Sequence, residues 1–309
     1  MYSPTNKHAY KKPYILVVMG IVCAFVYAFF LKSGTAYAGG TPPGGNITDP
    51  GVRAVDIAAP AVVRIITTIN GHLTVHFSST SNITFPQSSS ASYAVQVSGT
   101  GTFITSKGDI LTADHVVNPP KDQTLNQYLF TLAAQDVADY MNQNGKGQVT
   151  KDQVLQQLSG GQLQSTTSFD TPSSEALLST SYTGPLTAPD FNSLPTQIYA
   201  KVDQIEKESS PDQKDLAVVH VPMTDTPSVQ LGDSSNVQVQ DTLTIIGFPG
   251  NADVSQKPTD FLTSSINKIN VSSIKTTSSG APVIQVGGNV EHGDSGGPAL
   301  DTNGTVVGI

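Results

Sequence analysis

The hexapeptide Gly293-Asp294-Ser295-Gly296-Gly297-Pro298, near the end of this 309-residue chain, is the most specific string in the sequence. A serine hydroxyl is a poor nucleophile unless a neighbouring base takes its proton and hydrogen-bond donors face the developing oxyanion. Glycines on both sides of the serine allow a tight turn, in which the backbone N–H groups of Gly293 and Ser295 can point at one spot. The string therefore predicts a catalytic Ser295 and an oxyanion hole made by the N–H groups of Gly293 and Ser295.

The same letters also fit G-x-S-x-G, the nucleophile elbow of the α/β-hydrolases. That fold needs a helix directly after the serine, and then an acid and a histidine further along the chain. Only 14 residues follow Ser295; they begin Gly-Gly-Pro and contain no histidine. The α/β-hydrolase fold is therefore excluded, and the base must lie upstream of the serine.

The six histidines differ in how well each could serve as this base. Five stand in less suitable places: His8 before the N-terminal apolar run, His72 and His76 at alternate positions of a β-like run, His220 at the end of an apolar run, and His292 so close to Ser295 that it would have to bend back. His115 instead follows the apolar run Ile110–Ala113, at the end of a predicted strand. Because catalytic side chains commonly lie where strands end, His115 is the predicted base.

The acid that orients this histidine should lie at another strand edge, within reach of the ring nitrogen that faces away from the serine. Asp215 meets this condition, since it opens the apolar run Leu216–Val219. Asp114 adjoins the histidine and would point elsewhere, and Asp212 belongs to the preceding turn. We therefore expect His115, Asp215 and Ser295 to form a catalytic triad.

The phrases around all three residues resemble the trypsin-like serine proteases of the chymotrypsin fold, and among these the bacterial HtrA/Deg type. The likeness covers residues 55–118 and 197–309, and the strings that carry it are Ala59–Ile65, Ser98–Ile104, Gly108–Val117, Lys214–Val221, Leu231–Ser234, Ile246–Gly250 and Gly293–Ile309. The resemblance implies an all-β fold of two six-stranded β-barrels. It also implies a serine endopeptidase that cleaves protein or peptide substrates through an acyl-enzyme, with no metal and no organic cofactor.

Two features depart from the family pattern. His115 and Asp215 are 100 residues apart, whereas the family usually separates them by a few tens of residues. The chain also stops one short strand after Ser295, whereas the family continues with strands that wall the specificity pocket and often with a PDZ domain. We therefore expect a first barrel over residues 52–222 and a truncated second barrel over 223–309. Two interpretations stay open, a fragment of a longer protein or a naturally truncated and poor enzyme, and we favour the fragment because closing a barrel needs every strand.

Residues 119–196 lie outside the resemblance and form an insertion in the first barrel. Apolar residues recur at helical spacing between about 124 and 141, a second short helix should carry Val154, Leu155 and Leu158, and 159–196 is a Ser/Thr/Pro-rich stretch expected to be a loop. The segment 142–153 has the spacing of an EF-hand loop, but it has no carboxylate at positions 1, 3, 5 or 12, so we expect no calcium site. The insertion is interpreted either as a lid or docking element over the cleft or as an inert surface excursion.

The N-terminus has the features of an export signal. Residues 14–31 are uncharged and follow Lys7, Lys11 and Lys12, which keeps the start of the chain in the cytoplasm and sends the rest across the membrane. Ala36-Tyr37-Ala38 suits cleavage by signal peptidase, and a Gly/Pro linker follows over 39–51. Because 18 apolar residues are also nearly enough to span a bilayer, a retained membrane anchor stays open.

Composition limits the partners and the chemistry open to the chain. It has 24 acidic and 16 basic residues, a formal net charge of −8, which disfavours nucleic acid and anionic lipid as partners. Its single cysteine, Cys23, excludes an intramolecular disulfide and a cysteine-based metal site. Two non-enzymatic interpretations stay open: a catalytically inactive protease fold that acts as a binding module, and a surface protein whose insertion binds partners. The sequence does not indicate an oligomeric state.

The export signal makes a direct prediction. N-terminal sequencing of the protein recovered from outside the cytoplasm should begin at Gly39, because signal peptidase cleaves after A-x-A. Recovery of a chain that begins at Met1 in the membrane fraction would contradict cleavage and favour the anchor.

Overall fold

The computed structural model describes residues 47–145, 148–184, 199–210, 213–250, 260–288 and 290–309. The predicted export signal and most of the Gly/Pro linker lie outside these ranges. Within them, no helix combines the length and the apolar character needed to cross a bilayer.

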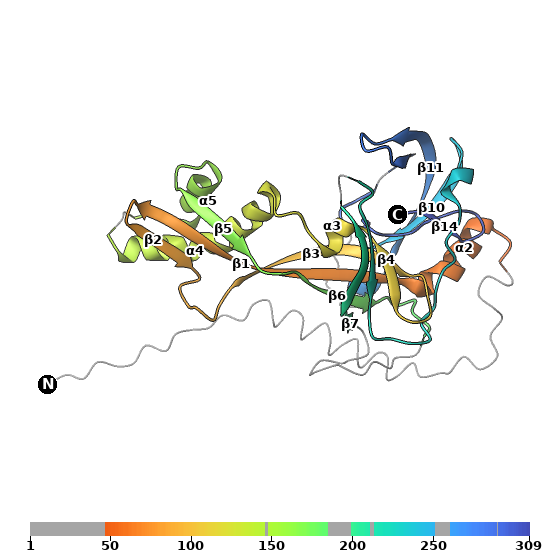
Figure 1. Ribbon diagram of the computed structural model, residues 1–309, viewed down its shortest axis with the longest axis horizontal. Helices are drawn as coiled ribbons and strands as arrows, with labels where there is room; N and C mark the ends of the chain where they lie inside the picture. The colour runs from red at the N-terminus through yellow and green to blue at the C-terminus, as the bar shows by residue number, and fades with distance from the viewer. Residues whose placement is uncertain (1–46, 146–147, 185–198, 211–212, 251–259, 289) are drawn as a thin grey trace.

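Two antiparallel sheets make up most of the molecule (Figure 1). The first contains β1 (Val62–Ser78), β2 (Ser81–Phe85), β3 (Tyr93–Phe103), β4 (Asp109–Thr112), β5 (Ser165–Phe169), β6 (Ser173–Leu178), β7 (Tyr199–Lys201), β8 (Gln204–Ser209) and β9 (Leu216–His220). The second contains β10 (Thr242–Gly247), β11 (Ser265–Thr276), β12 (Pro282–Gly287), β13 (Ala299–Leu300) and β14 (Val306–Gly308). Four α-helices and three short 3₁₀ helices accompany them in the described residues: α2 (Pro50–Ala58), α3 (Asp114–Val117), α4 (Gln123–Gln143), α5 (Lys151–Ser159), η1 (Ala59–Ala61), η2 (Ser234–Asn236) and η4 (Asp260–Leu262).

This architecture confirms the expected β fold of two barrels in its coarse form: the described residues are mostly β and build two curled sheets, with a few helices besides. In the first sheet the strands follow the order β7-β6-β1-β3-β4-β9-β8, with β2 and β5 also paired to β1. In the described part of the second sheet the order is β12-β11-β10-β13-β14. The first sheet thus has nine strands rather than the expected six: seven follow the path above, and β2 and β5 pair with β1 beside that path.

The strand β1 is longer than the sequence suggested. Asn70 and Gly71 interrupt its apolar sequence and would ordinarily indicate a break between residues 61–69 and 72–77. One strand nevertheless continues through them, because they pair with Ala94 and Tyr93 of β3. From Ile65 onward, buried residues alternate with more exposed ones, as expected of a strand that buries one face. The first half of β1 therefore belongs to the body of the molecule and the second half projects from it (Figure 1).

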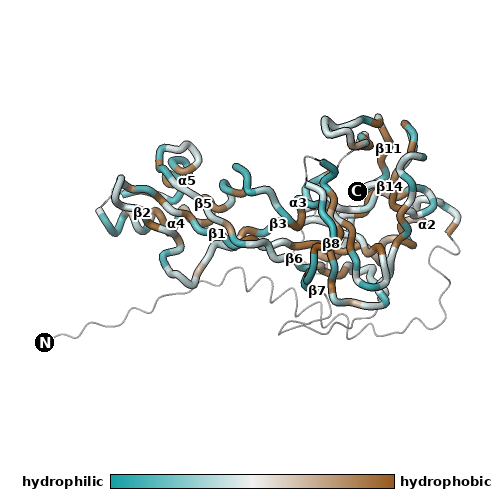
Figure 2. Tube along the Cα trace, in the orientation of Figure 1, coloured by the Kyte–Doolittle hydropathy of each residue, from teal (hydrophilic) through white to brown (hydrophobic). Residues whose placement is uncertain are grey.

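The main hydrophobic core joins the two sheets. It contains residues of β1, β3, β4, β6 and β9 together with Ile246, Phe248, Leu300 and Val306 from the second sheet or its edge. Figure 2 shows hydrophobic segments gathered in this body, around β6 and β14. Burial of apolar surface at this junction holds the two sheets against each other.

A second core lies in a projection that we call the arm, made of residues 70–78 of β1 with β2, β5, α4 and α5. Its buried residues come from both strands and helices: Leu73, Val75, Phe85, Ala133, Ala134, Val137, Ala138, Met141, Val154 and Leu158. The arm lies at one end of the molecule and the second sheet at the other (Figure 1). The helices of the insertion therefore cover strands that come from outside the insertion.

Both insertion helices were expected, but the loop expected over 159–196 was wrong for residues 165–178. Residues 165–169 form β5, which pairs with residues 71–75 of β1 in the arm. Residues 173–178 form β6, which pairs with residues 63–68 of β1 in the body of the molecule. Their Ser- and Thr-rich sequences lack the apolar alternation that identifies a strand. They form strands because they pair with β1, and this pairing cannot be read from their own residues. The helix α2 was also missed, although Asp49 caps it by accepting a hydrogen bond from Val52 N–H at 3.0 Å and Pro50 begins it, both common signals of a helix start.

The separate core of the arm leads to a prediction about its stability. Leu73 is fully buried, so Leu73→Ala should destabilise the arm by about 2–5 kcal/mol through lost burial and the cavity left behind. Hydrogen–deuterium exchange should then accelerate in α4 and α5, while β4 and β9 keep their protection, because the arm can open without the body. The matched control is Leu132→Ala on α4, where the side chain is 38% exposed and exchange should change little. Equal acceleration in the arm and in β4 and β9 would contradict a separate core.

Candidate active site

The pairing of β4 with β9 brings His115 and Asp215 together. The two strands are antiparallel and pair Thr112 with Ala217, so the residues after β4 lie beside the residues before β9. His115 lies in α3, the single turn that follows β4. Its ring Nδ1 is 2.7 Å from Asp215 Oδ2, and its backbone N–H donates to Asp215 Oδ1 at 3.0 Å. One carboxylate therefore holds both the ring and the backbone of the histidine.

This carboxylate also selects the proton position on the His115 ring. A carboxylate only accepts hydrogen bonds, so Nδ1 carries the proton and Nε2 of the neutral ring is left as an acceptor. The side chains of His115 and Asp215 are 35% and 32% exposed, which leaves the pair open to solvent on one side. Asp215 has a φ of +51°, a left-handed conformation that aspartate adopts more readily than most residues.

Ser295 lies in the turn before β13 of the second sheet and is half-buried. Its carbonyl accepts a hydrogen bond from the N–H of Thr100 on β3 at 2.8 Å. The next residue, Gly296, approaches the first sheet so closely that a Cβ there would lie 2.8 Å from the backbone nitrogen of Ala113. The turn therefore packs against the segment that leads into His115. Within the described residues, no hydrogen bond joins the Ser295 hydroxyl to the His115 ring.

The two predicted oxyanion donors are free among the described residues. Neither the N–H of Gly293 nor that of Ser295 donates to another described residue, whereas the intervening Asp294 N–H donates to the Glu291 carbonyl at 3.0 Å. Gly293 has a φ of +107°, and a Cβ at this position would lie only 2.2 Å from the Phe248 carbonyl oxygen. Only glycine fits this conformation and this approach.

Thr100 contacts the turn at two points, and sequence reasoning did not single it out. Its hydroxyl donates to the Gly293 carbonyl at 2.7 Å and accepts from Phe248 N–H at 3.1 Å, while its own N–H donates to Ser295. Its carbonyl accepts from the Thr112 hydroxyl at 2.7 Å. The side chain is fully buried. No local pattern marks such a residue, because its partners lie far away in the sequence.

The other candidates have different partners. Ring nitrogens of three histidines are engaged elsewhere: His72 with the Ala91 carbonyl at 3.0 Å, His76 with Asn82 at 2.9 Å, and His220 with Asp203 at 2.8 Å and the Lys107 carbonyl at 3.1 Å. His292 is exposed. His8 and Asp212 lie outside the described residues. Asp114 accepts a hydrogen bond from the Asn118 side chain at 2.9 Å, so it does not orient His115.

Asp294 is the buried acid of the turn. It is 4% exposed, and its Oδ2 accepts a hydrogen bond from Glu291 N–H at 3.0 Å. Burial raises the pKa of Asp294, although the hydrogen bond from Glu291 acts in the opposite direction. Its carboxylate fits against Gly247, where a Cβ would meet it, so this side chain packs between the turn and β10.

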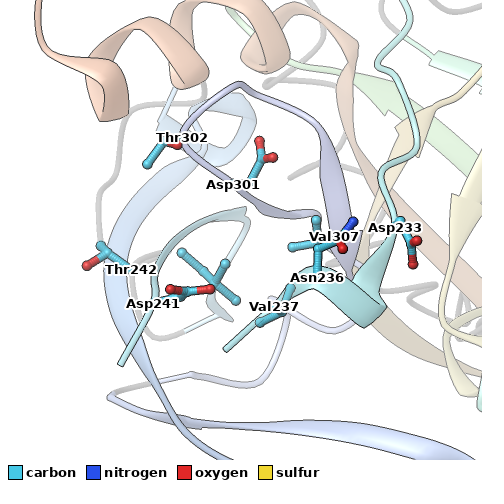
Figure 3. Close-up of a pocket in the computed structure, with 9 residues that line it drawn as sticks. Asp233, Asn236, Val237, Asp241, Thr242, Asp301, Thr302 and Val307 are labelled. Carbon is cyan, nitrogen blue, oxygen red and sulfur yellow. The ribbon is translucent and has the colours of Figure 1, made fainter. Parts of the chain in front are cut away.

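A cavity of about 290 Å³ lies in the second sheet, away from these groups (Figure 3). Three carboxylates line it, those of Asp233, Asp241 and Asp301. Each accepts a hydrogen bond from a backbone N–H of its own loop, namely Ser235, Gln238 and Thr305. These acids stabilise loops, and His115, Asp215 and Ser295 are not part of the cavity lining.

Comparison with known proteins gives three kinds of similarity. A family model described as a trypsin-like peptidase domain matches residues 99–309. "Serine protease Do-like HtrA" of Bacillus subtilis (strain 168) is 33% identical over 96 residues, which is 31% of this chain and 21% of that protein. Among solved structures, "HtrA-type protease AlgW with decapeptide" has a TM-score of 0.44 and 16% identity over 82% of this chain and 56% of that one. The serine endoprotease from Yersinia pestis has a TM-score of 0.40 and 16% identity over 82% and 54%. The chain spans less than two thirds of the length of each of these proteins.

The second histidine–aspartate pair predicts a pH-dependent stability. Both ring nitrogens of His220 face acceptors, so only the protonated ring can donate to Asp203 and to the Lys107 carbonyl at once. The hydrogen bond to Asp203, helped by the charges of Asp203 and Asp109, raises the pKa of His220 above its ordinary value of 6.5. Because the folded-state pKa is raised, the stabilisation is fully present below about pH 6.5 and is lost as the pH rises through the folded-state value.

This pH dependence can be measured from melting temperatures. The difference in Tm between the unmodified protein and His220→Gln should be largest near pH 5.5 and should shrink towards pH 8.5. A difference that stays constant over this range would show that the charge of His220 contributes nothing to folding.

Proposed function

Because this chain belongs to the trypsin-like peptidase family, we propose that it is an exported serine endopeptidase that hydrolyses peptide bonds in protein or peptide substrates. The observation that carries the proposal is the pair of hydrogen bonds from His115 to Asp215, next to a glycine turn that presents Ser295. A histidine held in this way is what an otherwise unreactive serine hydroxyl requires.

In the proposed reaction, Ser295 Oγ attacks the scissile carbonyl carbon and His115 Nε2 accepts the hydroxyl proton. The tetrahedral intermediate collapses to an acyl-enzyme when the C–N bond breaks, and His115 returns the proton to the leaving amine. Water then enters, gives a proton to His115 and attacks the ester carbonyl. When the C–O bond to Ser295 breaks, His115 returns that proton to Ser295 Oγ, which releases the acid product and regenerates the hydroxyl. Asp215 keeps the ring in the Nδ1–H form and stabilises the imidazolium that forms twice in each cycle.

The absence of a hydrogen bond between Ser295 and His115 among the described residues is compatible with this role. Catalytic hydrogen bonds in free enzymes are often long and tighten only when substrate binds. The free Nε2 acceptor and the half-buried Ser295 belong to turns that pack against each other through Gly296 and Ala113.

The N–H groups of Gly293 and Ser295 are the proposed oxyanion hole. As a peptide carbonyl becomes tetrahedral its oxygen gains negative charge, and two fixed donors stabilise that charge without reorganisation. In comparable enzymes one such donor contributes on the order of 3 kcal/mol to transition-state stabilisation. Neither donor is used by a described residue, which supports this role.

The triad assignment predicts a specific pattern of losses. Ser295→Ala and His115→Ala should each reduce the cleavage of a labelled, denatured protein by roughly a thousandfold or more, and the double variant should be little worse, because nucleophile and base act as one unit. Asp215→Asn should lower kcat by on the order of 10⁴, since an amide favours the wrong tautomer of the histidine. A fluorophosphonate probe should label the unmodified protein and not Ser295→Ala.

The chain offers a matched control for the acid. Asp203→Asn removes the carboxylate from the His220 pair, which has the same chemistry but lies apart from Ser295, and turnover should stay unchanged. Substantial activity in Ser295→Ala would refute the proposal. An unmodified protein that neither cleaves substrates nor reacts with the probe would favour an inactive protease fold that serves as a binding module.

A further inference from the structure

We propose that Thr100 is a positioning residue of this active site, whose hydroxyl holds the oxyanion hole in its working shape. The inference rests on the proposed function and adds to it a group that touches neither substrate nor the reacting atoms. It follows from the hydrogen bonds made by every peptide in the turn that precedes and includes Ser295.

Each peptide group of this turn is held by its carbonyl oxygen. The His292 carbonyl accepts from Gly250 N–H at 2.7 Å, and the Gly293 carbonyl accepts from the Thr100 hydroxyl at 2.7 Å. The Asp294 carbonyl accepts from Gly297 N–H at 2.8 Å, and the Ser295 carbonyl accepts from Thr100 N–H at 2.8 Å. In a trans peptide the C=O and N–H groups point in opposite directions within one plane. Anchoring the carbonyls of His292 and Asp294 therefore aims the N–H groups of Gly293 and Ser295.

The Thr100 hydroxyl acts on the peptide that lies between these two. The Gly293–Asp294 peptide lies between the peptide that carries Gly293 N–H and the peptide that carries Ser295 N–H. Its orientation therefore sets the angle between these two N–H groups. Gly293 has no side chain to restrict its rotation, and its φ of +107° lies outside the range preferred by other residues. Two hydrogen bonds therefore restrain this peptide: Asp294 N–H donates to the Glu291 carbonyl at 3.0 Å within the turn, and the Thr100 hydroxyl anchors the Gly293 carbonyl to a buried strand of the other sheet.

Threonine suits this position because its hydroxyl both donates and accepts. It donates to Gly293 and accepts from Phe248 N–H at 3.1 Å, and the loop that starts at Phe248 supplies Gly250 N–H to His292. The side chain is fully buried on β3, so no water can take its place without opening the structure. Loss of the hydroxyl would leave a buried carbonyl and a buried N–H without partners. Among the described residues, the Gly293–Asp294 peptide would then keep only its bond from Asp294 N–H to the Glu291 carbonyl, and any shift of this peptide would move both oxyanion donors.

The same strand contains a matched control. Thr102 is 1% exposed, and its hydroxyl has no hydrogen-bond partner among the residues that the structure describes. The substitution Thr102→Val therefore makes the same change of side chain, at equal burial and two residues away, without removing a hydrogen bond. It should leave activity unchanged.

The test compares Thr100→Val, Thr100→Ser and Thr102→Val in the full protein, with a fluorogenic peptide chosen for cleavage by the unmodified protein. Thr100→Val should lower kcat by roughly tenfold to a hundredfold, as expected when reacting groups are displaced by about 1 Å, with KM little changed. Labelling by a fluorophosphonate, whose adduct places an oxygen in the oxyanion hole, should slow by a similar factor. Thr100→Ser keeps the hydroxyl and should restore most of the rate, and melting temperatures should show that the variants remain folded.

The outcomes separate this inference from the function on which it rests. If the unmodified protein is inactive and unlabelled, the proposed function fails. If it is active and Thr100→Val equals Thr102→Val in kcat and labelling rate, the function stands and the role of Thr100 is refuted. A Thr100→Val variant that does not fold is replaced by Thr100→Ala. Failure of both to fold, under conditions where Thr102→Val folds, would also refute the proposal, since Thr100 would then serve stability alone.

Discussion

The contact between β3 and the turn at residues 293–295 is the constraint on which the rest of the site depends. His115 and Asp215 belong to the first sheet and Ser295 to the second, so neither sheet alone contains the three groups. Thr100 spans the junction with hydrogen bonds to Gly293 and Ser295, and its cross-strand partner Arg64 reaches over the same junction to place its guanidinium 3.7 Å from the centre of the Phe261 ring. Catalytic groups must be held to within about 0.5 Å of their working positions. A shared hydrophobic core does not fix positions that closely, and directional polar contacts therefore supplement it at this junction.

A carboxylate bonded to Nδ1 does not by itself make a histidine a catalytic base, and the two histidine–aspartate pairs of this protein illustrate the difference. His115 and His220 both bond a carboxylate through Nδ1, at 2.7 and 2.8 Å. The second nitrogen of His220 faces the Lys107 carbonyl, an acceptor that favours the protonated ring and helps to raise the pKa of His220. The second nitrogen of His115 is left as an acceptor, and the glycine turn packs nearby. A histidine that must accept a proton needs that free nitrogen, so the environment of Nε2 distinguishes a structural pair from a candidate base.

Sequence reasoning recovered what local patterns encode and missed what distant contacts impose. The apolar runs before His115 and after Asp215 indicated strand ends, and the structure joins the two residues by two hydrogen bonds; their catalytic roles remain a proposal. The helices of the insertion followed from the spacing of their apolar residues. Two of these residues, Tyr128 and Leu132, are exposed, whereas the smaller Ala133, Ala134 and Ala138 lie in the core of the arm. β5 and β6 were missed because pairing with β1 stabilises them, and Thr100 was missed because its partners stand about 150 to 195 residues away.

The central claim is that the junction of the two sheets assembles one active site, and a crystal structure of the protein after reaction with a fluorophosphonate tests it most directly. We expect a covalent bond from phosphorus to Ser295 Oγ, with a phosphonate oxygen within hydrogen-bond distance of the N–H groups of Gly293 and Ser295. We also expect that His115 stays bonded to Asp215 and that the Thr100 hydroxyl stays on the Gly293 carbonyl. An adduct on a different residue, or on Ser295 with the oxygen directed away from both N–H groups, would contradict this claim.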